Sequence, residues 1–278
     1  PPRAARGQRR SRAGRVTATD WDPRALPSLA GRTVVVTGGN AGIGYFVSEQ
    51  LASAGARVVI AARSAEKARV AIDAIRARVP DAELAHVPLD LTSLASVRRA
   101  AEEIAAFRPL HGLVNNAGRV VASRRRLETE DGYELTVGGN FLGHFALTTL
   151  LFPALASDGR VVGLGSDSTR MVRLEPADLW SEGRYGAFRA YAYSKHAVTG
   201  FQLELARRLE AAGDSRRSLL AHPGWATSAY AARRPGITDR DPWTGRVFEA
   251  LTGWVGQGKD RGAWPVVRAV ADPDAANG

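Results

Sequence analysis

Short apolar runs alternate with longer two-faced stretches along most of the chain, from about residue 31 onward. The runs are rich in β-branched residues and lack polar alternation, which is typical of strands buried on both faces of a parallel sheet. They predict strands at residues 32–38, 56–63, 83–90, 110–118, 159–166 and 217–224, the fourth of which runs into a loop.

The stretches between these runs have the spacing of amphipathic helices. In the first of them, Ile43, Phe46, Val47 and Leu51 fall on one face. Ser64 is a favourable N-cap for the second, because its side chain can accept a hydrogen bond from an early helical amide. The pattern predicts helices at residues 42–54, 64–78, 93–107, 133–156 and 188–212.

Strands that alternate with helices, joined by right-handed crossovers, predict a doubly wound parallel α/β sheet. We expect a single Rossmann-type domain over residues 21–278, with six or seven strands and helices on both faces. Residues 225–262 break the pattern with Pro235, Pro242, many glycines and three tryptophans. Long irregular segments often cover binding sites, so we expect this excursion to cover the substrate.

The net charge of +10 is concentrated at the start of the chain. Residues 1–15 hold six arginines and no acidic residue, and without those arginines the net charge is +4. Residues 1–20 are predicted to be a disordered arm, because this composition cannot bury enough apolar area. A transit peptide is less favoured, since no amphipathic face accompanies the arginines. No specific nucleic-acid partner is expected, although an accessory, salt-sensitive contact stays open.

The sequence has no cysteine, which excludes disulfides and thiolate chemistry. Its apolar runs are shorter than the ~20 residues of a membrane span. The longest, residues 145–156, contains Pro153 and is predicted to be a buried helix. We therefore expect no transmembrane segment and a cytoplasmic location. His144 and His222 lack a carboxylate or second histidine at ligand spacing, so no metal site is predicted.

The sequence TGGNAGIG, residues 37–44, lies where the first strand turns into the first helix. Glycines let backbone amides approach a pyrophosphate, whose negative charge the N-terminus of a helix favours. A glycine-rich loop is also compatible with a tight turn alone, but its position after the first strand favours a dinucleotide site. Contacts to the cofactor are expected from Gly38, Asn40, Gly42, Ile43 and Gly44.

The end of the second strand predicts which dinucleotide binds. An NAD site commonly has Asp or Glu there for the ribose 2′-hydroxyl, whereas this chain has Ala61, Ala62 and Arg63. Arginine can bind a 2′-phosphate, so NADP (NADPH) is expected to be preferred over NAD; alternatively, Arg63 is a surface residue at a strand end. Asp90 and Leu91 follow the third strand and are expected near the adenine, although Asp90 could equally be a turn residue.

The sequence AYAYSKHAV, residues 190–198, brings two tyrosines close to Lys195, one of three lysines in the chain. Only Tyr191, four residues before Lys195, shares its helical face, whereas Tyr193 should project away and pack. An ammonium group beside a phenol is either an ordinary surface neighbour or a means of favouring the phenolate form. The rest of the sequence favours the second interpretation.

Six ordered motifs resemble those of the short-chain dehydrogenase/reductase family, over roughly residues 28–271. They are TGGNAGIG (37–44), NNAG (115–118), GGNFLGHF (138–145), VVGLGS (161–166), YAYSK (191–195) and HPG (222–224). The NFLGHF wording and the long interval between Ser166 and Tyr191 resemble the retinol-dehydrogenase-like and protochlorophyllide-reductase-like branch.

This resemblance implies roles for individual residues. Asn140, Ser166, Tyr191 and Lys195 correspond to the catalytic tetrad of the family, with Tyr191 as the acid/base. Asn140 would also hold a water beside Lys195 and interrupt the helical hydrogen bonds locally. Further contacts to the cofactor are implied for Asn116, Ala117, Gly118, Tyr191, Lys195, Pro223, Gly224 and Thr227.

The resemblance implies hydride transfer between a nicotinamide and a small-molecule alcohol, ketone or aldehyde, with NADP expected from the end of the second strand. The tryptophans of residues 225–262 either indicate an apolar substrate or simply pack against the sheet. A dinucleotide-binding sensor or scaffold without turnover is the alternative, which the complete tetrad disfavours. Family members imply a homodimer or homotetramer. Two departures from the family are Gly165, where branch members often have a second serine, and the lack of an obvious seventh strand before Gly278.

Overall fold

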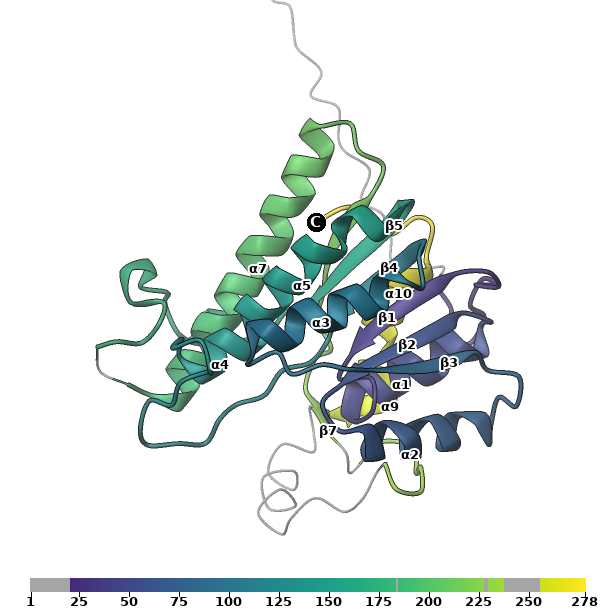
Figure 1. Ribbon diagram of the computed structural model, residues 1–278, viewed down its shortest axis with the longest axis horizontal. Coiled ribbons are helices and arrows are strands. Elements are labelled where there is room, and N and C mark those ends of the chain that lie inside the picture. The colour runs from purple at the N-terminus through teal and green to yellow at the C-terminus, as the bar shows by residue number, and fades with distance from the viewer. Residues whose placement is uncertain (1–20, 184, 228–229, 238–255) are drawn as a thin grey trace, which may run out of the picture.

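The computed structural model describes residues 21–183, 185–227, 230–237 and 256–278 of the chain (Figure 1). The predicted arm at residues 1–20 lies outside the described residues, and so does much of the predicted excursion at residues 225–262. The extent of the domain over residues 21–278 therefore stays a prediction.

Six parallel strands form the central sheet, as the apolar runs predict. Their order is β3 (Leu84–Pro88), β2 (Arg57–Ala62), β1 (Thr33–Thr37), β4 (Leu110–Asn115), β5 (Leu155–Leu164) and β6 (Arg217–Ala221). The first strand, β1, lies in the middle of the sheet. The strands β2 and β3 extend the sheet in one direction, and β4, β5 and β6 extend it in the other. The strand order thus reverses between β1 and β4, and ligands of doubly wound sheets bind at the carboxyl ends of strands at such a point.

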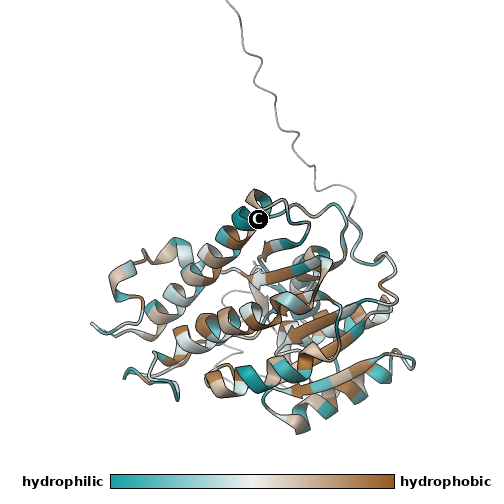
Figure 2. Cartoon of the chain, turned by 45° about the horizontal axis from the view of Figure 1, so that its top comes forward, coloured by the Kyte–Doolittle hydropathy of each residue, from teal (hydrophilic) through white to brown (hydrophobic). Residues whose placement is uncertain are grey.

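Helices cover both faces of the sheet, which confirms the predicted doubly wound architecture (Figure 1). Buried side chains form two cores, one on each face. In Figure 2 much of the central sheet is brown, the hydrophobic end of the scale. One core takes residues from α1 (Gly42–Ser53), α2 (Ala65–Arg76) and α10 (Trp264–Ala271). The other takes residues from α3 (Leu94–Ala105) and α5 (Gly143–Leu151), and α7 (Ala187–Ala211) packs beside them.

The helix predicted at residues 133–156 is divided, which corrects the sequence interpretation. It consists of α4 (Leu135–Val137), a π-helical turn at Gly138–Leu142, α5 and a 3₁₀ turn at Phe152–Ala154. The π turn contains Asn140, so the expected interruption of the helical hydrogen bonds is confirmed. The helix stops early because Pro153 offers no amide hydrogen and Leu155 already pairs with Leu110 of β4.

Several short elements lie around the carboxyl edge of the sheet. After β5 come α6 (Ser168–Met171) and a 3₁₀ turn at Pro176–Asp178. After β6, the strand β7 (Ala226–Thr227) pairs in parallel with β8 (Gln257–Gly258), and β8 leads directly into α9 (Lys259–Gly262). At the far edge, the amide of Gly278 donates to the carbonyl of Ser218 in β6 at 2.9 Å.

One helical stretch of the described residues, Leu135–Ala154, is long and apolar enough to cross a membrane by length and composition alone. Half of its most apolar window is buried inside the fold, as in a core helix of a sheet protein, so this is weak evidence for a span. The sequence interpretation of residues 145–156 as a wholly buried helix is wrong in part, because Phe145 and Leu150 are 42% and 46% exposed.

Candidate active site

Two adjoining hollows lie where the strand order reverses, and they share Gly38, Asn40, Ala117 and Gly118. The larger, of about 520 Å³, is lined by Gly38, Asn40, Ala41, Gly42, Ile43, Gly44, Asn116, Ala117, Gly118, Leu164, Gly165, Tyr191, Lys195, Pro223 and Lys259. The smaller, of about 190 Å³, is lined by Gly38, Asn40, Ala61, Ala62, Arg63, Leu89, Asp90, Leu91, Thr92, Ala117, Gly118, Arg119, Gly139 and Asn140.

The glycine loop leaves room for a bound group against the first turn of α1. Gly42 has a φ of +57°, which favours glycine, and a Cβ placed there would meet no atom within 4 Å. At Gly44 a Cβ would lie 2.4 Å from the carbonyl oxygen of Gly38. The N-cap residue, Ala41, supplies no capping side chain, so the helix presents its first amides toward the larger hollow. This arrangement fits the pyrophosphate of a dinucleotide.

The smaller hollow holds the residues expected at the adenine end of a cofactor. The carboxylate of Asp90 accepts two hydrogen bonds from Thr92, at 2.9 Å from the amide and 2.7 Å from the hydroxyl. Arg63 lies 3.8 Å from the same carboxylate and is 66% exposed. Burial acts to raise the pKa of Asp90, but the Thr92 hydrogen bonds and the charge of Arg63 outweigh it and hold the pKa below its usual value. The carboxylate of Asp90 is therefore held in place by Thr92, whereas the exposed side chain of Arg63 can reorient.

Tyr191 and Lys195 lie at one wall of the larger hollow, and Ser166 lies next to Tyr191. The Tyr191 hydroxyl lies 3.5 Å from the Ser166 Oγ, which also accepts the amide of Ser168 at 3.2 Å. The Lys195 Nζ lies 5.8 Å from the centre of the Tyr191 ring, so these two residues share a face of α7 as their spacing predicts. Tyr193 is buried and lines neither hollow.

Lys195 is a buried cation with a single fixed acceptor among the hydrogen bonds that the described residues make. Its Nζ donates to the carbonyl of Leu164 at 3.0 Å, and the residue is 7% exposed. Burial lowers the pKa of Lys195 from 10.5 to about 8, because the charged form loses its hydration. Its charge is therefore sensitive to whatever occupies the hollow.

Asn140 connects the π turn to the loop after β4. Its side chain donates to the carbonyl of Arg119 and accepts the amide of Arg119, both at 3.0 Å, and it also donates to the Ser194 Oγ at 3.1 Å. The amide group of Asn140 is thus occupied in holding the NNAG loop against α7. Its part in holding a water beside Lys195 stays a prediction.

His144 holds the backbone of Asn140 through a buried hydrogen bond. The Nδ1 of His144 donates to the Asn140 carbonyl at 2.9 Å, which leaves Nε2 of the neutral ring to accept the hydroxyl of Thr37 at 2.8 Å. The same Thr37 oxygen accepts the amide of Ala117 at 3.0 Å. Burial lowers the pKa of His144 to about 4, so the ring is neutral near pH 7. One buried histidine therefore ties the end of β1 and the NNAG loop to the π turn.

Most residues expected from the sequence line the two hollows, but three of them do not. Ser166 follows the lining residue Gly165, and its hydroxyl lies 3.5 Å from that of the lining residue Tyr191; Gly224 and Thr227 follow the lining residue Pro223. Two charged residues of the lining, Arg119 and Lys259, were not predicted from the sequence. Lys259 is one of only three lysines in the chain, which makes it notable in the sequence, but no recognisable motif surrounds it. Arg119 follows the NNAG motif directly.

His222 has a neighbour that sequence spacing did not reveal. Its Nε2 lies 3.5 Å from the carboxylate of Asp167, and its Nδ1 accepts the amide of Gly224 at 3.0 Å. Sequence spacing could not reveal this carboxylate, because Asp167 and His222 lie on different loops, after β5 and β6, that meet at the sheet edge. No group of three or more ligating side chains occurs among the described residues.

A glycine loop at the point of strand reversal, with a tyrosine and a lysine on one face of α7, indicates a dinucleotide-dependent dehydrogenase or reductase. Residues 32–228 match a family model described as short chain dehydrogenase. The chain belongs to the short-chain dehydrogenase/reductase family, as its six motifs predicted.

Relatives with named activities support the retinol-dehydrogenase-like branch. The polyprenol dehydrogenase of Mus musculus is 42% identical over 264 residues, which cover 92% of this chain and 76% of the relative. Retinol dehydrogenase 12 of Homo sapiens is 40% identical over 204 residues, which cover 72% of this chain and 63% of the relative. The chain therefore spans only part of the length of these proteins.

Solved structures support the fold. A short chain dehydrogenase from Burkholderia cenocepacia J2315, solved in complex with NADP, has a TM-score of 0.67 and 27% sequence identity to this chain. The match covers 87% of this chain and 91% of the Burkholderia chain. The two chains thus share their fold over most of their length.

Proposed function

We propose that the protein is an NADP-dependent oxidoreductase that interconverts an alcohol and a carbonyl compound, with Tyr191 as the acid/base. The observation that carries this proposal is that Tyr191 and Lys195 line the same hollow as the glycine loop, with the Ser166 hydroxyl 3.5 Å from that of Tyr191. A bound nicotinamide would supply or accept the hydride there.

The two hydroxyl groups have separate tasks in this proposal. Ser166 Oγ accepts the Ser168 amide, so its own proton is available to the oxygen of a substrate. In reduction, the Tyr191 hydroxyl then gives its proton to that oxygen as negative charge develops on it. In oxidation, the phenolate of Tyr191 takes the proton of the alcohol. Lys195 favours the phenolate through its charge.

Asn140 and His144 would hold the catalytic residues in fixed relative positions. Asn140 holds the loop after β4 against α7, and His144 holds Asn140. Asn140, Lys195 and Tyr191 would then lie at fixed distances when a substrate arrives. Preorganisation of this kind lowers the reorganisation cost of proton transfer.

The preference for NADP rests on the wall of the smaller hollow. Arg63 lies there with Ala61 and Ala62, and no carboxylate is available at the end of β2. The guanidinium of Arg63 is 66% exposed, so it can turn toward a 2′-phosphate. The related Burkholderia protein was solved with NADP, which agrees with this choice.

The substrate is proposed to be an apolar alcohol or carbonyl compound. Large apolar side chains are exposed in the segments that follow the carboxyl ends of β4, β5 and β6: Val120 (49%), Met171 (68%), Trp225 (47%) and Tyr230 (53%). Relatives are named for polyprenol and retinol, which are apolar alcohols. A polyprenol- or retinol-like alcohol is therefore the first substrate class to test.

A sensor or scaffold without turnover is not favoured, because Asn140, Ser166, Tyr191 and Lys195 are all present and lie together. The homodimer or homotetramer and the cytoplasmic location remain predictions.

The deciding experiment is an activity screen with the purified protein. NADPH oxidation would be followed with ketones, aldehydes and quinones, and NADP⁺ reduction with polyprenol and retinol. We expect turnover with at least one apolar pair and slower turnover with NAD(H). Tight NADPH binding without turnover on any of these compounds would favour the sensor instead.

A further inference from the structure

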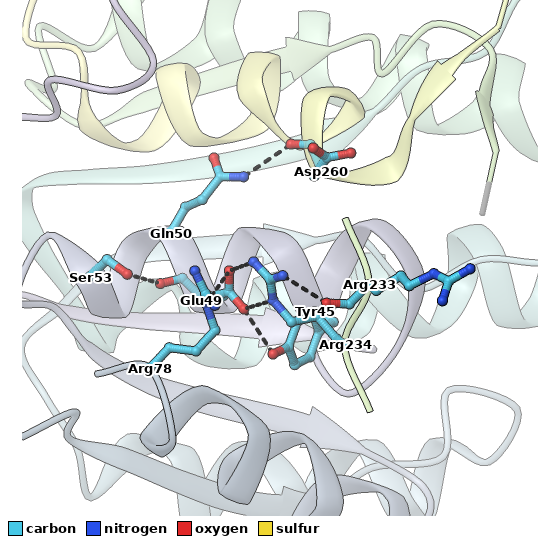
Figure 3. Close-up of polar contacts among 8 residues, drawn as sticks. All are labelled: Tyr45, Glu49, Gln50, Ser53, Arg78, Arg233, Arg234 and Asp260. Carbon is cyan, nitrogen blue, oxygen red and sulfur yellow. Dashed lines mark hydrogen bonds and ion pairs between the residues drawn. The ribbon is translucent and has the colours of Figure 1, made fainter. Parts of the chain in front are cut away.

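A buried ion pair joins α1 to a segment far along the chain. Arg234 donates to both carboxylate oxygens of Glu49, from Nε and from Nη2, each at 2.6 Å (Figure 3). The Glu49 side chain is 9% exposed and the Arg234 side chain 13%. A planar guanidinium that meets a carboxylate at two points fixes both distance and orientation.

Two further groups hold the same carboxylate (Figure 3). The Tyr45 hydroxyl, one turn earlier on α1, donates to it at 2.8 Å, and Arg78 lies 3.6 Å away. Burial acts to raise the pKa of Glu49, but the hydrogen bonds from Arg234 and Tyr45 outweigh it and hold the pKa below its usual value. Glu49 is therefore ionised near neutral pH, and Arg234 is its most closely bound cation.

Arg234 belongs to residues 230–237, a described segment that lies against α1 and α2. A Cβ on Gly236 would lie 2.7 Å from Val70 of α2, and Ile237 packs against the core that contains α1. At the other end of the segment, the carbonyl of Tyr230 would lie 2.4 Å from a Cβ on Gly258. The 230–237 segment thus runs from the β7–β8 pair to the helices behind the glycine loop.

The strand β8 and the helix α9 carry this connection back to the dinucleotide hollow. Lys259, directly after Gly258, lines the hollow together with the glycine loop. Gln50, the neighbour of Glu49 on α1, donates to the carbonyl of Asp260 at 3.0 Å (Figure 3). Glu49 therefore binds the 230–237 segment, and Gln50 binds α9. Both residues lie about two helical turns after the first amides of α1, which face the hollow.

We propose that Glu49 and Arg234 are positioning residues for the cofactor: their ion pair holds the 230–237 segment so that β8 and Lys259 close the pyrophosphate side of the hollow. The inference rests on the proposed function, because it takes a dinucleotide to be the ligand. A buried ion pair adds little net stability over well-packed apolar groups, so fixing one arrangement of the chain is its more plausible use here.

The test compares NADPH binding with thermal stability in three variants: Glu49→Gln, Arg234→Met and the double variant. Each single variant leaves a buried charge without its partner, so we expect the melting temperature to fall by roughly 5–10 °C. The Kd for NADPH, measured by fluorescence quenching, should rise about tenfold, equivalent to about 1.4 kcal/mol. The rate of NADPH dissociation, measured by stopped-flow displacement, should rise with it.

The double variant separates positioning from stability. It has neither charge, so much of the lost melting temperature should return, whereas the Kd and the dissociation rate of NADPH should stay raised about tenfold. Arg78→Gln is the matched control, because it removes a cation from the same carboxylate without touching the 230–237 segment. We expect it to leave NADPH binding unchanged.

Two results would overturn the inference. One is an unchanged Kd for NADPH in single variants that remain folded. The other is a Kd that recovers in the double variant together with the melting temperature, since the pair would then act on stability alone. Failure of the wild-type protein to bind NADPH or NADH is a different result, because it would remove the proposed function itself.

Discussion

The hydroxyl of Tyr191 lies 3.5 Å from the hydroxyl of Ser166, and the Ser166 oxygen already accepts the amide of Ser168. With that amide bound, Ser166 keeps its own proton to donate, and an oxygen within reach of both hydroxyls could accept a hydrogen bond from each. The pair is therefore arranged to bind an oxygen on which negative charge develops.

Tyr191→Phe is expected to lower kcat by about 10²–10⁴, the usual contribution of a positioned acid or base. The Kd for NADPH should change little, because the ring and Lys195 stay in place. Steady-state kinetics and fluorescence titration would measure the two effects. Tyr193→Phe is the control, since Tyr193 is buried away from both hollows. A larger loss of kcat in Tyr193→Phe would contradict the assignment of the acid/base to Tyr191.

The sheet could be predicted from the sequence because each strand is a compact apolar run between helical stretches. Thr33–Thr37 is such a run, with three consecutive valines, and all five of its residues are buried in the structure, as expected of a central parallel strand. The division at Gly138–Leu142 is different in kind. Nothing in the apolar pattern marks it, and only the family resemblance, which implied an interruption at Asn140, pointed to it.

The missed contacts share one cause, which is distance in sequence. Asp167 meets His222 because the loops after β5 and β6 end at the same edge of the sheet, and Glu49 of α1 meets Arg234 because residues 230–237 lie against that helix. Hydrophobic periodicity reports the environment of a residue and not its partner. Tyr191 and Lys195 could be paired from the sequence because both lie on one helix at a four-residue spacing.

Arg63→Ala is expected to weaken NADPH binding strongly and NADH binding little. A charge-assisted hydrogen bond contributes about 1.5–3 kcal/mol, so the preference for NADPH should fall by roughly 10- to 100-fold. Because Arg63 is exposed and lies 3.8 Å from Asp90, the lower part of this range is the better estimate. Fluorescence titration with both cofactors measures the change.

Ala62→Asp is the matching change in the opposite direction. Ala62 lines the smaller hollow beside Arg63, so a carboxylate there would repel a 2′-phosphate and accept a ribose hydroxyl. The preference should move toward NADH. Equal affinities of the wild-type protein for NADPH and NADH would remove the NADP assignment and leave Arg63 as a surface residue.

Lys195 should make NADPH binding dependent on pH. Burial lowers its pKa to about 8 in the cofactor-free protein, so the ammonium is present at pH 7 and lost as the pH rises through about 8. The Kd for the anionic cofactor is therefore expected to increase between pH 7 and pH 9.5. Lys195→Met should bind NADPH more weakly at pH 7 and show no such step. A flat profile for the wild-type protein would contradict the prediction.

His144→Phe should lower stability and change its dependence on acid. The substitution leaves the Asn140 carbonyl and the Thr37 hydroxyl without their buried partner, at a cost of about 1–3 kcal/mol.

In the wild-type protein, the pKa of His144 is lowered from 6.5 to about 4, so between these values the unfolded chain binds a proton that the folded chain does not. Stability contributed by the neutral ring is thus complete above pH 6.5 and is lost as the pH falls toward 4. Urea unfolding of both proteins at pH 7 and pH 5 should therefore show a smaller difference at pH 5. Because the pKa of His111 is also lowered by burial, only the difference between the two proteins isolates His144. An equal difference at both pH values would show that His144 does not titrate in this range.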